Sequence, residues 1–184
     1  RGGRRLTVGV YVDDLIITGD HDDEIRSFKG EMMKLFKMSD LGALRYYLGI
    51  EVTLDSDGIT LGQAAYAGKI LERAGLKDYN PCQTPMEVRL KLGKNSDFPL
   101  VDATLYRSLV GSLWYLVNTR PYLAFSVGYV SHFMESPRAD HLAAVRRILH
   151  YVAGTRCWGI RFGLGAQGTS PKLLSILTVI WLVI

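Results

Sequence analysis

The first forty residues change from a strand-like run to an amphipathic helical run. Residues 6–18 are rich in β-branched and aromatic residues and are interrupted by two aspartates. Because aspartate is a poor strand residue and a good turn residue, this run predicts a hairpin with Asp13 and Asp14 at its tip. Residues 22–37 have apolar side chains three and four positions apart, acidic residues at the start and lysines at the end. That pattern predicts a helix.

A second hairpin and a short helix are expected next. Residues 48–61 have strand-like composition on either side of a Ser-Asp-Gly turn. Residues 64–74 have the pattern of a helix, and Gly75 is suited to the position that follows its last turn. Residues 77–105 contain three prolines and few periodic apolar positions, so we expect an extended linker between two subdomains.

The rest of the chain has a mainly helical pattern. It predicts helices over about 106–117, 121–136 and 138–152, followed by a strand at 159–162. Residues 173–184 are mostly apolar. They are too few to span a bilayer as a helix, which takes roughly 20 residues. A strand or helix packed on the core, an out-of-frame tail and a membrane anchor remain open for this segment, and we expect no stable membrane insertion.

Composition places the chain among ordinary globular proteins. Hydrophobic residues make up 48% of the 184 residues, charged residues 22%, and the net charge is +4. This mild basic excess fits a nucleic-acid partner without requiring one. Cys82 and Cys157 lie far apart and belong to no Cys/His cluster, which argues against a structural zinc site and a disulfide framework.

The strongest chemical feature is the pair of carboxylates at Asp13 and Asp14, between two hydrophobic strand segments. Two carboxylates on a tight hairpin repel each other, and a divalent cation would relieve the repulsion. Magnesium prefers such hard oxygen ligands, and a magnesium pair can activate a 3′-hydroxyl and stabilise a leaving pyrophosphate. A magnesium pair held in this way would carry out nucleotidyl transfer. The alternative is that both aspartates are solvated turn residues.

A second feature is a basic face on the expected helix 138–152. Arg146, Arg147 and His150 lie on one side of it, away from the apolar stripe. They could contact the phosphates of a primer–template duplex, which gives affinity that weakens with salt and carries no sequence choice. The alternative is a solvated helix face.

Seven segments resemble the copia-type retrotransposon reverse transcriptases, in the order of that family and across roughly residues 6–162. The first is the hairpin segment Gly-Val-Tyr-Val-Asp-Asp-Leu-Ile-Ile-Thr-Gly at 9–19. The others are 36–42, 46–52, 84–86, 106–116, 119–121 and 141–154. A single Tyr-x-Asp-Asp is a weak signal, whereas this ordered series is specific.

The resemblance implies an α+β fold, in which antiparallel hairpins and a helix form part of a polymerase palm and a mainly helical thumb or connection region follows. Residues 1–62 would be the palm part with a primer-grip-like hairpin, 63–105 a thumb-like helix and linker, 106–165 the helical region and 166–184 a divergent tail. The implied activity is RNA-directed DNA polymerisation with Mg²⁺ on a primer–template duplex and deoxynucleotides.

In that family Asp13 would be the principal metal-binding aspartate of this motif, with Asp14 beside it and Tyr11 near the primer terminus. The family also uses a third carboxylate and fingers, which would precede residue 1, and an RNase H domain, which would follow near residue 170. Tyr122 stands where the family usually has an aspartate that could cap a helix.

We therefore expect a chain that does not polymerise alone and needs the missing fingers, palm and RNase H segments. The alternative is a nucleic-acid-binding or degenerate transposon remnant without chemistry. No targeting signal appears in the sequence, and the family context implies cytoplasmic particles followed by nuclear entry.

Overall fold

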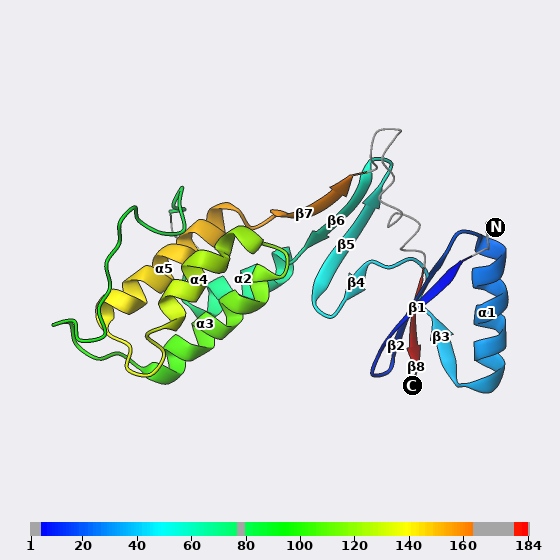
Figure 1. The fold of residues 1–184 in the computed structure, drawn as a ribbon, viewed down its shortest axis with the longest axis horizontal. Coiled ribbons are helices and arrows are strands. Elements are labelled where there is room, and N and C mark those ends of the chain that lie inside the picture. Colours follow the sequence, from blue (N-terminus) through cyan, green and yellow to red (C-terminus); the bar gives the residue numbers. More distant parts are fainter. Residues whose placement is uncertain (1–4, 77–79, 164–178, 184) are drawn as a thin grey trace. The chain divides into compact units, whose positions relative to one another are not determined.

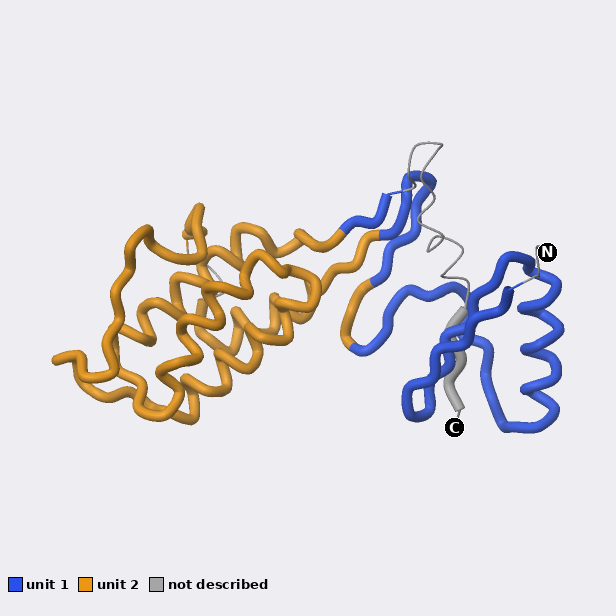
Figure 2. Tube along the Cα trace, viewed as in Figure 1, with its two compact units in different colours: residues 1–48, 52–59, 161–184 blue, residues 49–51, 60–160 orange. Residues whose placement is uncertain are grey.

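The chain folds into two compact units, and each is described here by itself. A computed structural model describes residues 5–76, 80–163 and 179–183. Unit 1 comprises Arg1–Leu48, Val52–Ile59 and Arg161–Ile184, and unit 2 comprises Gly49–Glu51 and Thr60–Ile160 (Figure 2). Both units contain segments from distant parts of the sequence, so neither is a continuous stretch of chain.

Unit 1 is built on a four-stranded sheet with one flanking helix (Figure 1). The strands, in spatial order, are β1 (Leu6–Tyr11), β2 (Asp14–Gly19), β8 (Val179–Val183) and β3 (Met38–Asp40). Strand β2 pairs antiparallel with β1 and β8, and β3 pairs antiparallel with β8. Residues 179–183 of the apolar segment near the C-terminus therefore form a strand inside this sheet, whereas the rest of the expected tail at 166–184 lies largely outside the described residues. In the part of the chain that the structure describes, no helix is long and apolar enough to cross a membrane.

Helix α1 (Asp22–Leu35) packs on this sheet and closes a small core. Leu15, Ile17 and Ile25 are its buried members. The helix begins with three acidic residues, which complement the positive end of its dipole. Lys29 on α1 is 8% exposed and donates to the carboxylate of Asp40 on β3 at 3.0 Å, which ties the helix to the far edge of the sheet.

A second antiparallel sheet has the order β4 (Tyr46–Tyr47), β5 (Ile50–Asp55), β6 (Gly58–Gly62) and β7 (Gly159–Gly163). Arg161 on β7 makes a two-pronged hydrogen bond to Asp55 on β5, with N–O distances of 2.8 and 3.0 Å. The hydrogen bonds from Arg161 hold the pKa of the Asp55 carboxyl below its usual value. This contact joins strands that lie more than a hundred residues apart in sequence.

Unit 2 is a helical bundle with one large core (Figure 1). Its helices are α2 (Ala64–Arg73), α3 (Ala103–Val117), the 3₁₀ turn η1 (Pro121–Leu123), α4 (Ala124–Ser131) and α5 (Ala139–Gly154). Helix α3 is capped by Asp102, whose carboxylate accepts from the backbone N–H groups of Thr104 and Leu105. The bundle buries Leu113, Leu116 and Ile148 completely. Burial on this scale supplies most of the stability of a helical unit.

Arg120 lies inside this bundle and is fully buried. Its Nη2 donates to the carbonyl of Arg156, whereas its Nε and Nη1 have no hydrogen-bond partner among the described residues. Burial lowers the pKa of the Arg120 guanidinium. The neighbouring Tyr122, which stands where an acidic residue was expected, packs edge-on against Tyr151 and Trp158 at ring-centroid distances of 6.1 and 6.2 Å.

Residues 80–102, here named the strap, connect α2 to α3 by running along unit 2 rather than by crossing to another subdomain. Its backbone bonds to α4 and α5 at several points. Leu92 N–H donates to the Tyr129 hydroxyl at 3.1 Å, and the Gly93 carbonyl lies 3.1 Å from His141 Nε2. Pro99 carbonyl accepts from the N–H of Ala139 at 3.0 Å. These bonds satisfy backbone groups in a segment that has almost no regular structure of its own.

The predicted α+β fold class is confirmed, with antiparallel hairpins and a helix followed by a helical region. The element expected over 121–136 is shorter than predicted, because a 3₁₀ turn precedes α4 and the helix ends at Ser131. The helix expected from about 106 begins at Ala103, because Asp102 provides an N-cap.

Candidate functional site: the Asp13–Asp14 hairpin

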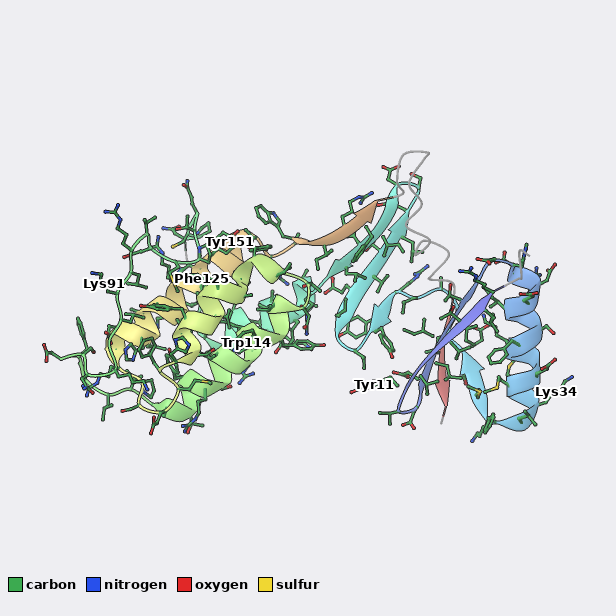
Figure 3. The ribbon with its side chains drawn as sticks, viewed as in Figure 1. Tyr11, Lys34, Lys91, Trp114, Phe125 and Tyr151 are labelled. Atoms are coloured by element: carbon green, nitrogen blue, oxygen red, sulfur yellow. The ribbon has the colours of Figure 1, made fainter. Side chains whose placement is uncertain are left out.

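The candidate site is the turn between β1 and β2. Tyr11 and Asp14 are paired across the two strands, so Val12 and Asp13 form a two-residue turn. The apolar side chains of β2 explain this geometry. Leu15 and Ile17 are buried on the sheet, and their period-two spacing fixes which residues reach the tip. Tyr11 is visible at the end of β1 in Figure 3, and it is 53% exposed.

Val12 holds an unusual backbone conformation at this tip. Its φ is +50°, a left-handed value that β-branched residues rarely adopt. Two-residue hairpin turns need positive φ to match the strand twist, and glycine or asparagine normally supplies it. The side chain of Val12 is also 80% exposed, so no core packing compensates for the strain. Strained residues of this kind concentrate at functional sites.

Replacing Val12 with glycine is expected to stabilise unit 1 by about 1 kcal/mol. Glycine adopts positive φ without strain, which outweighs its larger loss of chain entropy on folding. The matched control is Val10→Gly, at an exposed position of β1 without a positive φ. It should destabilise by about 0.5–1 kcal/mol. Urea unfolding of both variants measures the two effects, and equal changes in the same direction would contradict a strained turn.

The carboxylates of Asp13 and Asp14 are available to a ligand. Asp13 is exposed and Asp14 is half-buried. Within residues 5–76, 80–163 and 179–183, neither carboxylate has a hydrogen bond or ion pair to a protein group. Tyr47 on β4 is close enough to interact electrostatically with Asp14. Burial, followed by the charge of Asp14 and the nearby Tyr11, raises the pKa of the Tyr47 hydroxyl.

This donor set suits a hard divalent cation, but it is small. Two adjacent carboxylates supply oxygen ligands of the kind that magnesium takes, usually together with water and substrate phosphates. No cluster of three His, Cys, Asp or Glu side chains that could hold a metal occurs in the described parts of the chain. The hairpin therefore fits as one part of a metal site whose other ligands come from substrate, water or other protein groups.

The predicted basic residues of α5 also lie together, within unit 2. Arg146 is exposed, and Arg147 and His150 are half-buried. Arg147 donates to Glu87 at 2.9 Å and to the hydroxyl of Thr84 at 3.2 Å. Thus Arg147 helps to hold the strap, whereas Arg146 has no hydrogen bond or ion pair among the described residues. The predicted site residues therefore fall into two groups. One is at the hairpin in unit 1, and the other is on α5 in unit 2.

Two features next to the predicted site residues were not anticipated from the sequence. One is Tyr47 beside the hairpin, and the other is the strap, whose Glu87 pairs with Arg147. A cue for the strap is present in the sequence. Its three prolines limit regular structure, and chain without regular structure must satisfy its backbone through other groups.

Comparison with known proteins identifies the relatives of the chain. Residues 1–88 match the family model described as reverse transcriptase (RNA-dependent DNA polymerase). The chain is 39% identical over 160 residues to the retrovirus-related Pol polyprotein from transposon RE1 of Arabidopsis thaliana. It is 39% identical over 173 residues to the corresponding polyprotein from transposon TNT 1-94 of Nicotiana tabacum. An uncharacterized mitochondrial protein of Arabidopsis thaliana is 34% identical over 152 residues.

These similarities cover most of this chain and only part of each relative. The alignments span 87% of the chain with the RE1 polyprotein, 89% with TNT 1-94 and 82% with the mitochondrial protein. The same alignments span 11%, 13% and 62% of the relatives. No solved structure matches the chain significantly.

Proposed function

Because this chain belongs to the copia-type retrotransposon reverse transcriptases, as a segment of their Pol polyprotein, we propose that it supplies the metal-binding hairpin for RNA-directed DNA synthesis. One observation carries the proposal. Asp13 and Asp14 are adjacent carboxylates without a hydrogen bond or ion pair among the described residues, on a strained and solvent-accessible turn.

In this proposal each residue of the hairpin has a defined task. Asp13 is the principal ligand of magnesium, and Asp14 is the second carboxylate beside it. Magnesium bound there supplies Lewis-acid activation of the primer 3′-hydroxyl and charge stabilisation of the leaving pyrophosphate. Tyr11, half-exposed on the neighbouring strand, positions the primer terminus. Since the primer hydroxyl is the nucleophile, the protein contributes binding, orientation and charge rather than a nucleophile of its own.

We further propose that the chain does not extend a primer by itself. Two carboxylates provide fewer oxygen ligands than a pair of magnesium ions takes. Full activity would need the third carboxylate and the fingers that the reverse-transcriptase family also uses. This proposal predicts complementation. The chain becomes active when mixed with a separately produced upstream reverse-transcriptase segment from a related transposon.

Primer extension on an RNA template with magnesium tests this proposal. The expected result is no extension by the purified chain, no extension by the upstream segment, and extension by the mixture that a chelator abolishes. Extension by the chain alone would overturn the requirement for complementation. Failure of a mixture in which both parts are folded and associated would overturn the role of the hairpin.

A second candidate function is nucleic-acid binding without chemistry, as in a degenerate transposon remnant. It is favoured by Arg146, an exposed cation that has no protein partner among the described residues of α5 and its surroundings. Salt-dependent binding of a primer–template duplex with no extension under complementation would support it. In both functions Arg146, Arg147 and His150 lie on the surface that we propose to contact nucleic acid.

A further inference from the structure

Unit 2 contains a pocket between α5 and the strap, with a volume of about 600 Å³. Helix α5 contributes Ala143, Arg146, Arg147 and His150 to its lining. This volume lies within the range of about 300–1,000 Å³ that is typical of pockets for small ligands. The three basic residues predicted from the sequence therefore line a cavity rather than an open helix face.

The strap forms the apolar side of this pocket. Leu90, Leu92 and Phe98 line it. Phe98 is 55% exposed, although a phenylalanine in a soluble protein is usually packed away from water. An aromatic ring held at the wall of a pocket is a platform on which a planar group can stack, and base stacking needs no sequence-specific hydrogen bonds.

The pocket is held in shape by hydrogen bonds between the strap and α5. Arg147 bonds to Glu87 and Thr84, and Ser96 donates to Asp140 at 3.1 Å. The carbonyl of Phe98 itself accepts from Arg138 at 2.8 Å. Because both ends of the strap are anchored in this way, the aromatic wall does not have to be ordered when a ligand arrives, which favours binding.

Two acidic residues and two arginines line the pocket, namely Glu87, Asp140, Arg146 and Arg147, and one of the two arginines forms no ion pair in the described structure. Glu87 is neutralised by Arg147, and Asp140 accepts a hydrogen bond from Ser96. Arg146 has no counter-charge among the described residues, and the Nε of Arg147 is buried without a hydrogen-bond partner in the described structure. An occupant with an anionic group and a planar apolar body could pair with Arg146 and pack against the apolar wall.

We infer that this pocket binds one unpaired nucleotide of a single strand, with its base against Phe98 and its phosphate at Arg146. This inference deepens the proposed contact of α5 with nucleic acid and rests on it. A duplex offers phosphates but keeps its bases paired and stacked, so a duplex could reach Arg146 without using the apolar wall. An unpaired nucleotide uses both.

Fluorescence anisotropy of the full chain with three labelled ligands tests the inference. The ligands are a single strand of adenine deoxynucleotides, an abasic strand of equal length and a duplex. The adenine strand is expected to bind about tenfold more tightly than the abasic strand. Phe98→Ala should remove this advantage, since stacking of one base contributes about 1–3 kcal/mol, and Phe98→Tyr should retain it.

Arg146→Ala is expected to weaken binding of both single strands and to reduce the salt slope by about 0.7, the value for one phosphate contact on a single strand. The control is Lys69→Ala, an exposed lysine of α2 that does not line the pocket. It should change affinity less than twofold. All three positions are exposed, so thermal unfolding should confirm that the variants remain folded.

Equal affinity for the adenine and abasic strands, unchanged by Phe98→Ala, would overturn the proposal that this pocket binds an unpaired nucleotide. The proposed role of the hairpin in primer extension would not be affected by that result. No binding of any strand by the folded chain would also overturn the proposal for the pocket. Base-dependent binding in a mixture that never extends a primer would support the pocket and count against the proposed polymerase role of the hairpin.

Discussion

Asp13→Asn is expected to lower primer extension by the complemented chain on the order of 10²–10³-fold, the loss that follows removal of one preorganised charge-stabilising group. Asparagine keeps the size and the turn preference of aspartate but loses the negative charge. Its side chain therefore preserves the hairpin while weakening a site that depends on charge. The initial rate of extension at saturating magnesium is the measurement.

The matched control is Asp20→Asn, which removes an exposed carboxylate just beyond the other end of β2. It should leave extension unchanged. Manganese binding provides an independent measurement, because the paramagnetic ion broadens the amide signals of residues near it. We expect broadening around Asp13 and Asp14 in the wild-type chain and in Asp20→Asn, but not in Asp13→Asn. Equal broadening in all three chains would show that the hairpin does not hold the metal.

Leu113→Ala is expected to destabilise unit 2 by about 3 kcal/mol. Leu113 is fully buried on α3, a helix that packs against α2, α4 and α5. Truncating a leucine at such a position removes its transfer free energy and leaves a cavity, which together cost about 2–5 kcal/mol. The bundle surrounds the site on several sides, so it has little freedom to collapse into the space.

The control for this variant lies on the same helix. Leu105 is 43% exposed, and Leu105→Ala should cost less than about 1 kcal/mol, since alanine is the better helix former and little apolar area is lost. Urea unfolding followed by far-UV circular dichroism reports the loss of the helices that make up unit 2. Similar costs for both variants would contradict the assignment of Leu113 to the centre of the core.

The sequence was sufficient to predict the hairpin at the site and most of the helices. These elements follow from local patterns: the β-branched and aromatic residues on both sides of the hairpin tip, the turn preference of Asp13, and the acidic first turn of α1. The hairpin needs only residues a few positions apart, so its register is encoded within the segment itself.

Features that depend on distant partners were not predictable in this way. The short strand β3 pairs with β8, so nothing in its own three residues marks it as a strand. The pocket on α5 requires Phe98 and Arg146, which lie far apart in sequence and are brought together by the strap. The basic residues were found from helical spacing, but their cavity was not, because the strap has no periodic pattern to place it.

The position of β8 has a consequence for the order in which the chain assembles. A ribosome makes β1, β2 and β3 before unit 2, yet β8, which lies between β2 and β3 in the sheet, is synthesised only after unit 2. Until then the hairpin and β3 have no strand to join them, and unpaired strand edges are open to pairing with other chains. Unit 2 can fold first from more local contacts, which form faster than pairings across long loops. Strands β1, β2 and β3 are thus made before unit 2 and joined into one sheet only after it, so we expect nascent chains halted before residue 179 to be prone to aggregation.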